Sequence, residues 1–241
     1  MKAVVLAAGY GTRLGGLTRE TAKAMLPVAG QPLLEHVIRR LARHGFDEIA
    51  INLHFRPEQI RDYFGDGAAF GVRLEYSYEP ELLGTAGTIA SLRSFLGEGG
   101  PFLIHYGDVI TDHDFSAMLD VHRERDALVT LLVHERPGSN SVVVLDDEQR
   151  IVEFVERPPL DDPSRARSSW VNSGVCICAP RFLDLLSPTP GDLARDVLPA
   201  LAGRPDVIAH GLTGFRIAVD SPARYRQAEQ ALAEGRLAWE R

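Results

Sequence analysis

The stretch Leu6-Ala-Ala-Gly-Tyr-Gly-Thr-Arg-Leu14 decides the fold. It starts within an apolar run at residues 4–8, which predicts a buried strand, and it continues into a glycine-rich loop. Ligands of open α/β sheets bind at the carboxyl ends of the strands. Small residues and glycine allow the backbone to approach a phosphate group and to direct N–H groups at it. The stretch therefore predicts an α/β sheet with a phosphate site after its first strand.

Strand and helix patterns alternate along the rest of the first half. This order is typical of a mostly parallel sheet with helices on both faces. The second half is less regular, and the turn-forming sequence Asp146–Arg150 between two apolar runs predicts a hairpin. Without an internal repeat or a linker, we expect a single Rossmann-like α/β domain over residues 1–241. The expected strands are 4–8, 48–53, 72–76, 102–105, 128–133, 141–145, 151–155, 171–179, 207–210 and 215–219, and the expected helices are 32–44, 57–64, 85–96, 115–125, 181–186, 193–201 and 222–239.

Composition and charge exclude several classes of protein. The 241 residues are 45% hydrophobic with a net charge of −7, which argues against general binding to nucleic acid. No apolar run reaches the roughly 18–20 residues of a membrane span, and the first one stops at Gly9, too early for a signal peptide. Cys176 and Cys178 lack further metal ligands nearby, so we expect two buried thiols. These features favour a cytoplasmic protein without a membrane partner.

The glycine-rich loop departs from two better-known phosphate loops. The dinucleotide fingerprint requires glycine where this chain has Leu14, and a Walker A loop requires Gly-Lys-Ser/Thr, which is absent. The second strand ends in Asn52-Leu-His54 without an acidic residue, which disfavours a nicotinamide-dependent oxidoreductase. The loop instead contains Arg13 and is followed by Lys23, one of only two lysines among 26 basic residues.

The longer stretch LAAGYGTRLGGLTRETAKAMLPVAGQPLLEHVI, residues 6–38, resembles the signature of the nucleotide-diphospho-sugar pyrophosphorylases, or sugar-1-phosphate nucleotidyltransferases. Their pattern is L-A-A-G-x-G-T-R-L, a lysine, and a proline about four residues later. The segment around YEPELLGTAG looks most like the mannose- and heptose-1-phosphate guanylyltransferase branch. Five further segments resemble family motifs in the family's order: Leu83–Gly87, Gly107–Val109, Val155–Pro158, Val171–Gly174 and Val219–Pro222.

The resemblance implies the nucleotide-diphospho-sugar transferase fold, without the β-helix tail of some relatives, and a site made of two halves. Residues 1–110 would bind the nucleotide and residues 111–241 the sugar phosphate. Arg13, Lys23, Asp108 and Asp220 are the implied catalytic residues, and Asp108 and Asp220 would also bind Mg²⁺. Leu6, Ala8, Gly9, Gly11, Thr12, Arg13, Lys23, Glu79, Gly84 and Thr85 would bind the nucleotide; Glu156, Arg157 and Asn172 would bind the sugar phosphate.

Each of these positions also has an ordinary structural interpretation. Asp108 is compatible with a turn, Asp220 with a helix N-cap before Ser221-Pro222, and Glu156 with a solvated charge. Arg157 replaces the lysine of the family's E-K-P motif, which leaves the pose of the sugar phosphate open.

The implied reaction joins a nucleoside triphosphate to a sugar-1-phosphate of the hexose or heptose type and releases pyrophosphate. Glu79 suggests GTP, because a carboxylate only accepts hydrogen bonds and guanine presents donors at N1 and N2. UTP, dTTP, CTP and ATP remain alternatives, as does a catalytically silent nucleotide-sugar-binding regulator. The sugar and the oligomeric state are left open, and a homo-oligomer is compatible with the sequence.

Overall fold

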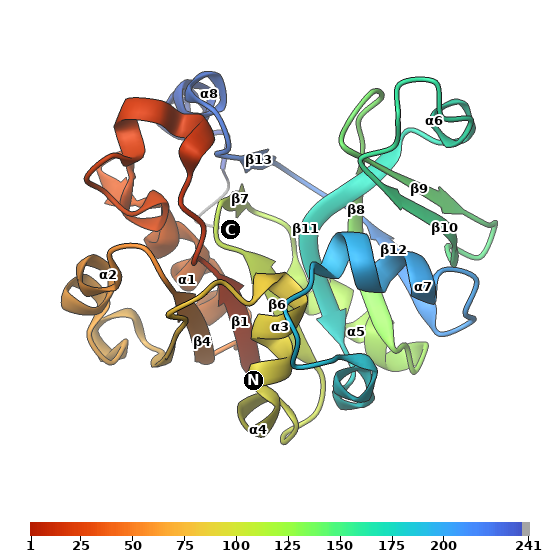
Figure 1. Cartoon of the computed structure of the whole chain (residues 1–241), viewed down its shortest axis with the longest axis horizontal. Coiled ribbons are helices and arrows are strands. Elements are labelled where there is room, and N and C mark those ends of the chain that lie inside the picture. The colour runs from red at the N-terminus through yellow and green to blue at the C-terminus, as the bar shows by residue number, and fades with distance from the viewer. Residues whose placement is uncertain (238–241) are drawn as a thin grey trace. The chain divides into compact units, whose positions relative to one another are not determined.

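The computed structural model describes residues 1–237 of the chain (Figure 1). Contacts within the chain fall into two compact units. The first unit consists of Met1–Leu82, Ile104–Phe115 and the chain from Thr213 onward, and the second consists of Leu83–Leu103 and Ser116–Leu212. The expected nucleotide-binding half (residues 1–110) and sugar-phosphate-binding half (residues 111–241) describe function and stay predictions; the compact units follow contacts, and the chain returns to the first unit for its last segment. Most residues expected to bind the nucleotide, together with Asp220, lie in the first unit.

Four strands in the order β6-β1-β4-β5 form the centre of the first unit, and β1, β4 and β5 are parallel. β1 (Lys2–Leu6) pairs with β4 (Glu48–Leu53), and β4 pairs with β5 (Arg73–Tyr78). β6 (Phe102–Tyr106) enters this unit with its last three residues. The middle residues of β1 and β4 are fully buried, as expected for parallel strands with apolar side chains on both faces.

Helices and short strands complete the first unit. The predicted apolar face of α1 is buried, because Leu33, Leu34, Val37, Ile38 and Leu41 recur at helical spacing. Two short strands, β7 and β13, pair antiparallel, and Ile110 and Ile217 from them share a small core with Ala228 of α8. The elements are α1 (Leu33–Arg43), α2 (Pro57–Phe64), α8 (Pro222–Ala233), β2 (Pro27–Val28), β3 (Gln31–Pro32), β7 (Val109–Thr111), β13 (Arg216–Ala218) and 3₁₀ turns at Thr12–Thr18, Lys23–Met25 and Ala68–Phe70.

The second unit is built on three strands in the order β12-β8-β11. β12 (Val207–Gly211) is parallel to β8 (Val129–Glu135), whereas β11 (Trp170–Cys178) is antiparallel to it. The predicted hairpin is present as β9 (Ser141–Leu145) and β10 (Ile151–Glu156). The helices are α3 (Gly84–Ser91), α4 (Arg93–Leu96), α5 (Phe115–Glu124, whose first residue belongs to the first unit), α6 (Ser164–Arg167) and α7 (Leu198–Leu201), with a 3₁₀ helix at Pro180–Leu185 and a π-helical turn at Leu193–Val197.

The α/β class with mostly parallel strands is confirmed, and several boundaries differ from expectation. The helix expected over 85–96 is interrupted at Leu92, which leaves helical geometry between α3 and α4. Residues 157–169, where no helix was expected, contain the single turn α6, and the closing helix ends at Ala233. The expected end of that helix at Trp239 lies outside the described residues. β7 was not predicted, since three residues carry too little pattern to identify a strand.

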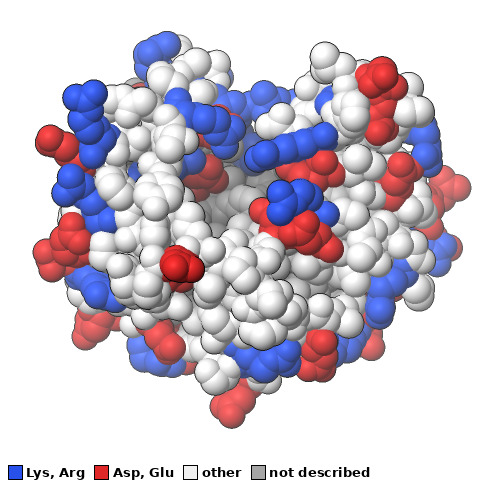
Figure 2. Space-filling view, in the orientation of Figure 1, with Lys and Arg blue, Asp and Glu red and all other residues white. Residues whose placement is uncertain are grey.

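Other expectations concern burial and surface charge. Cys176 and Cys178 are buried and unbridged, with their Sγ atoms 3.8 Å apart. In the face drawn in Figure 2, acidic and basic side chains are intermixed instead of forming a broad basic field. Among residues 1–237, no helix has the length and apolar character needed to cross a membrane.

Candidate active site

The glycine-rich loop leaves β1 and turns into the 3₁₀ helix Thr12–Thr18. Gly11 adopts a left-handed conformation (φ 67°), and a Cβ there would lie 2.9 Å from Thr18 and 3.1 Å from the Cβ of Lys23. Only glycine therefore lets the loop pack against the stem of Lys23. Of the predicted nucleotide contacts here, Gly9, Thr12 and Arg13 are exposed, Leu6 and Gly11 are half-buried, and Ala8 is buried.

Asp108 lies beside this loop because the preceding glycine approaches the end of β1 closely. The N–H of Gly107 donates to the carbonyl oxygen of Leu6 (2.9 Å), and a Cβ on Gly107 would lie 2.9 Å from the same oxygen. A larger residue at 107 would push Asp108 away from the loop. The sequence signal Gly-Asp after an apolar strand thus has a steric cause in the structure.

The β7–β13 ladder brings the second predicted aspartate next to the first. Val109 pairs with Ala218, and the N–H of Val219 donates to the carbonyl oxygen of Asp108 (2.8 Å). Asp220 follows directly, so two carboxylates that are 112 positions apart in the numbering reach the same end of a two-stranded ribbon. Ser221 caps α8 through its hydroxyl, which accepts from the N–H of Arg224, so the cap role does not fall to Asp220.

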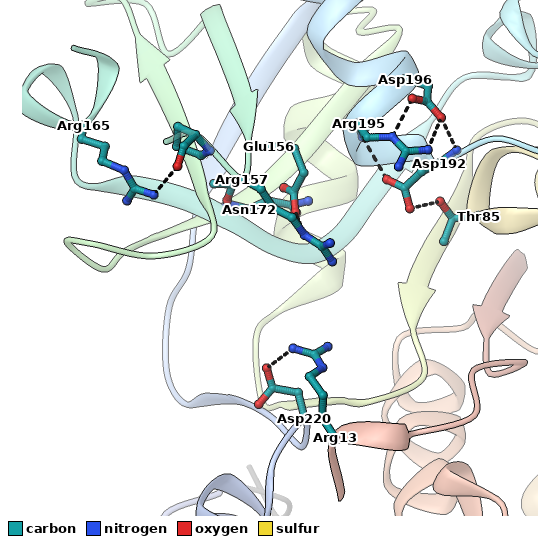
Figure 3. Close-up of polar contacts among 12 residues, drawn as sticks. Arg13, Thr85, Glu156, Arg157, Arg165, Asn172, Asp192, Arg195, Asp196 and Asp220 are labelled. Atoms are coloured by element: carbon teal, nitrogen blue, oxygen red, sulfur yellow. Dashed lines mark hydrogen bonds and ion pairs between the residues drawn. The ribbon is translucent and has the colours of Figure 1, made fainter. Parts of the chain in front are cut away.

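Each aspartate is paired with one of the predicted cations. Lys23 Nζ lies 2.6 Å from Asp108 Oδ2, and the lysine side chain is only 14% exposed. Arg13 Nη1 lies 3.5 Å from Asp220 Oδ2 (Figure 3), and Arg224 lies 3.7 Å from the other oxygen of that carboxylate. The four predicted catalytic residues are therefore brought together in the first unit as two ion pairs.

The charges around Asp108 keep its carboxylate ionised. Burial raises the pKa of Asp108, but the Lys23 ammonium, with Arg216 and Arg13 farther away, opposes this and holds the pKa below its ordinary value. On the preceding strand β6, burial lowers the pKa of His105 to about 4, so this imidazole is neutral at physiological pH. The site thus presents carboxylates and fixed cations without a basic imidazole between them.

Asn52, near the end of β4, is a residue of the site that the sequence analysis did not identify. Its Oδ1 accepts from the N–H groups of Ala7 (2.7 Å) and Ala8 (3.3 Å), and its Nδ2 donates to Glu79 Oε1 (2.9 Å). Glu79 is only 2% exposed. Its predicted contact with the base is untested, and the structure shows its carboxylate bound to Asn52. A terminal strand asparagine carries no local signal, because its role depends on pairing with a distant strand.

The predicted second nucleotide loop lies in the second unit. Gly84 has φ 69°, and a Cβ there would lie 2.4 Å from the carbonyl oxygen of Gly191. The hydroxyl of Thr85 accepts from the N–H of Leu193 (2.6 Å) and donates to Asp192 Oδ2 (3.4 Å), as Figure 3 shows for the side chains. These contacts fix the start of α3 against the π-helical turn, an arrangement that often marks functional regions.

The predicted sugar-phosphate residues lie at the ends of β10 and β11 in the second unit. Glu156 is largely buried, and this burial raises its pKa, with Arg157 lowering it and Asp192 raising it further. Arg157 has a left-handed backbone (φ 51°) and a side chain that is 79% exposed, with Nε 3.8 Å from Glu156 Oε1. Asn172 Oδ1 accepts from the N–H of Gly174 (2.8 Å), and its own N–H donates to Ser141 Oγ.

The segment after Arg157 is fastened by Arg165. Its guanidinium donates to the carbonyl oxygens of Pro158 (2.6 Å), Pro159 (2.8 Å) and Ser139 (3.1 Å). Three hydrogen bonds from one planar group hold the proline-rich turn to the segment that precedes β9. The conformation of the backbone at Arg157 is therefore set by its surroundings, while its side chain remains exposed.

A metal ion at this site would depend on ligands beyond the two aspartates. Within residues 1–237, no group of three or more His, Cys, Asp or Glu side chains has the spacing of a metal site. Asp108 and Asp220 together offer hard carboxylate oxygens at one end of the ribbon. Mg²⁺ is commonly held by one or two carboxylates together with water and substrate phosphates, so this donor set fits Mg²⁺ in the presence of a phosphorylated ligand.

Comparison with known proteins identifies the family. The sequence profile of the family described as nucleotidyl transferase matches residues 2–205. The chain belongs to the nucleotidyl transferase family. This confirms the resemblance stated from the motifs, and the match includes parts of both units.

Two relatives of this nucleotidyl transferase chain illustrate its similarity to characterised sequences. It is 34% identical over 216 residues to a UTP–glucose-1-phosphate uridylyltransferase of Synechocystis sp., covering 83% of this chain and 55% of the relative. It is 32% identical over 226 residues to the catalytic subunit beta of a mannose-1-phosphate guanylyltransferase of Dictyostelium discoideum, covering 92% and 62%. The chain thus spans less than two thirds of the length of either relative.

A solved structure supports the fold. A UDP-glucose pyrophosphorylase in complex with UDP-glucose superposes with a TM-score of 0.83 at 22% identity, covering 97% of this chain and 98% of the other. At this identity the likeness establishes the fold alone. The predicted nucleotide-diphospho-sugar transferase architecture is therefore confirmed at the level of the fold.

Proposed function

We propose that this chain transfers a nucleotidyl group from a nucleoside triphosphate to a sugar-1-phosphate, giving a nucleotide sugar and pyrophosphate. The observation that carries the proposal is the pair of ion pairs beside the glycine-rich loop, Lys23 with Asp108 and Arg13 with Asp220. This arrangement supplies cations for phosphate oxygens and carboxylates for a divalent metal within one unit. Both relatives described above are named for this type of reaction.

GTP is the triphosphate that we propose first. Guanylyltransferases for mannose-1-phosphate recur among the relatives at 30–32% identity. A uridylyltransferase for glucose-1-phosphate is similar to the same degree, so UTP is the main alternative, before dTTP, CTP and ATP. We propose a hexose-1-phosphate or heptose-1-phosphate as the acceptor.

The chemistry requires positioning more than covalent catalysis. An oxygen of the sugar-1-phosphate attacks the α-phosphorus of the triphosphate, the new P–O bond forms in line, and the bond to pyrophosphate breaks. The attacking phosphate is already anionic, so no side-chain nucleophile or general base is needed. Charge neutralisation and orientation then provide most of the rate enhancement.

We assign the following roles to the chain's own groups. Lys23 binds an oxygen of the α-phosphate, and Arg13 binds the departing pyrophosphate, with the N–H groups of Gly9, Gly11 and Thr12 available to the triphosphate. Gly84 and Thr85 remain proposed nucleotide contacts. In the second unit, Arg157 binds the phosphate of the sugar-1-phosphate, and Glu156 and Asn172 bind sugar hydroxyls.

We propose Mg²⁺ as the cofactor, held by Asp108 and Asp220. When bound, a divalent cation would neutralise charge on the reacting phosphates. The ionised state of Asp108, maintained by Lys23 despite burial, suits it for this ligation. A cytoplasmic location and a homo-oligomeric state remain predictions.

A pyrophosphate-release panel tests the proposal. The purified chain would be mixed with Mg²⁺, each of GTP, UTP, dTTP, CTP and ATP, and each of mannose-1-phosphate, glucose-1-phosphate and a heptose-1-phosphate. We expect release that requires both substrates, with GTP giving the highest kcat/KM. Binding of nucleotide sugar without release from any pair would instead support the silent regulator.

A further inference from the structure

The side chain of Asn52 connects β4 to the start of the glycine-rich loop, at Ala7 and Ala8. In the parallel register Asn52 is opposite Leu6, the last residue of β1, and its side chain is 5% exposed. One carboxamide oxygen accepts from both Ala7 and Ala8. These two N–H groups are consequently directed at Asn52, and the loop becomes available for a ligand only from Gly9 onward.

Glu79 completes this arrangement from β4's other neighbour in the sheet. It follows β5 directly, and its carboxylate accepts from Asn52 Nδ2 at 2.9 Å. Because the oxygen of the carboxamide faces two donors, the nitrogen must face an acceptor, and Glu79 provides it. This hydrogen bond to the carboxylate thereby fixes the orientation of the amide.

The backbone of Glu79 makes a second connection to the same loop. Its N–H donates to the carbonyl oxygen of Leu53 (2.8 Å), and its carbonyl oxygen accepts from His54 Nδ1 (2.7 Å). His54 Nε2 in turn accepts from the hydroxyl of Tyr10 (2.5 Å), which belongs to the loop. The loop is therefore held on both sides of Gly9, at residues 7–8 through Asn52 and at residue 10 through His54.

We propose that Asn52 and Glu79 are positioning residues that preset the glycine-rich loop for a triphosphate, whatever its base. This inference rests on the proposed function and gives Glu79 a different task from base recognition. A carboxylate that is almost fully buried and bound by an amide on the neighbouring strand acts on the nucleotide through the backbone of the loop. Preorganised N–H donors favour binding because little conformational entropy is lost when the phosphates arrive.

Exchanging the amide and the carboxylate between positions 52 and 79 tests the Asn52–Glu79 pair. Asn52→Asp keeps an acceptor for Ala7 and Ala8 but places a second carboxylate against Glu79. We expect it to raise KM for the triphosphate about tenfold or more. Glu79→Gln alone leaves an amide oxygen for Asn52 Nδ2, so we expect a change within about threefold. In the double variant the introduced amide donates to the introduced carboxylate, and we expect KM to return to within about threefold of the wild type.

Two readouts separate this role from a merely structural one and from base recognition. KM for GTP and KM for UTP should rise by the same factor in Asn52→Asp, and the GTP/UTP ratio of kcat/KM should be unchanged in Glu79→Gln. A double variant no better than Asn52→Asp, or an altered base preference in Glu79→Gln, would overturn the proposal.

Binding measurements distinguish a failure of this inference from a failure of the proposed function. Calorimetric titration with GTP and Mg²⁺, and hydrogen exchange at Ala7 and Ala8, require no turnover. If the wild type binds GTP but turns over no substrate pair, the proposed function fails while the exchange pattern still tests the pair. Equal amide protection and equal GTP affinity in Asn52→Asp and the wild type would overturn the inference alone.

Discussion

Lys23 in the first unit and Arg157 in the second are both predicted to bind phosphate, but they are held in different ways. Lys23 is 14% exposed, packs against Gly11 and is paired with a carboxylate from a distant part of the sequence. Arg157 is 79% exposed, and its nearest carboxylate belongs to its neighbour in the chain. A cation confined in this way should depend on the shape of its side chain, whereas an exposed one should depend mainly on its charge.

The largest expected effect comes from removing the charge that Lys23 is paired with. Asp108→Asn should lower kcat by about 10²-fold or more, because it removes a carboxylate proposed to bind Mg²⁺ and leaves Lys23 without its ion-pair partner. Steady-state kinetics across a range of Mg²⁺ concentrations would measure this, with Asp120→Asn, an exposed position on α5, as the matched control. Normal turnover at low Mg²⁺ by both Asp108→Asn and Asp220→Asn would refute the metal assignment.

The next effect tests whether the confinement of Lys23 matters. Lys23→Arg preserves the charge but introduces a planar guanidinium where the loop packs against the lysine stem, so kcat/KM should fall about tenfold or more, about 1.4 kcal/mol. Lys2→Arg, at the only other lysine of the chain, is the matched control and should be near normal. If Lys23→Arg keeps wild-type kinetics, the ammonium acts only through its charge.

Each unit contains a buried histidine that should make the free energy of unfolding depend on pH. Burial lowers the pKa of His105 in the first unit and of His122 in the second to about 4, against 6.5 for an unperturbed histidine. The unfolded chain therefore binds protons that the folded chain does not between about pH 6.5 and pH 4. Stability is fully present above this window and is lost as the pH falls through it, at about 1.4 kcal/mol per pH unit for His105.

Denaturant unfolding between pH 7 and pH 5 would measure this slope. His122→Gln should lower the number of protons taken up on unfolding by about one, because one titrating group is removed. The slope of the free energy of unfolding against pH should fall accordingly. An unchanged slope would show that His122 is not a neutral histidine in the folded protein.

The smallest effect is expected at the exposed cation. Arg157→Lys restores the lysine of the family motif and keeps both charge and backbone conformation, so kcat/KM should remain within about threefold of the wild type. Arg165→Lys is an instructive comparison, since it breaks the contact of one guanidinium with three carbonyl oxygens and should loosen the segment. A tenfold loss in Arg157→Lys would mean that the exposed guanidinium is as constrained by shape as Lys23.

The sequence predicted those parts of the site that depend on local pattern. The glycine-rich loop is identifiable from its composition, and Lys23 and the Gly107-Asp108 pair were identified through the family resemblance. The structure adds a steric reason for Gly11 and Gly107. The strands and α1 followed from apolar periodicity. The meeting of Asp108 with Asp220 followed from the family resemblance, and the structure explains it by the β7–β13 ladder.

The remaining features depend on register between segments far apart in the chain. Asn52 contacts the loop only because β1 and β4 pair with Leu6 opposite it, and no local signal indicates this. The burial of Glu79 and the contact of Thr85 with Asp192 arise in the same way. Such contacts are consequences of tertiary packing, which a single sequence does not specify directly.

The separate phosphate-binding roles proposed for Arg13 and Arg157 can be measured without turnover. Calorimetric titration of GTP with Mg²⁺ into Arg13→Met and Arg157→Met compares the same substitution in the two units. Arg13→Met should weaken GTP binding about tenfold, because Arg13 is assigned to the triphosphate, and Arg157→Met should bind GTP as the wild type does. Equal weakening by both variants, or wild-type affinity in Arg13→Met, would contradict the assignment of the nucleotide phosphates to the first unit.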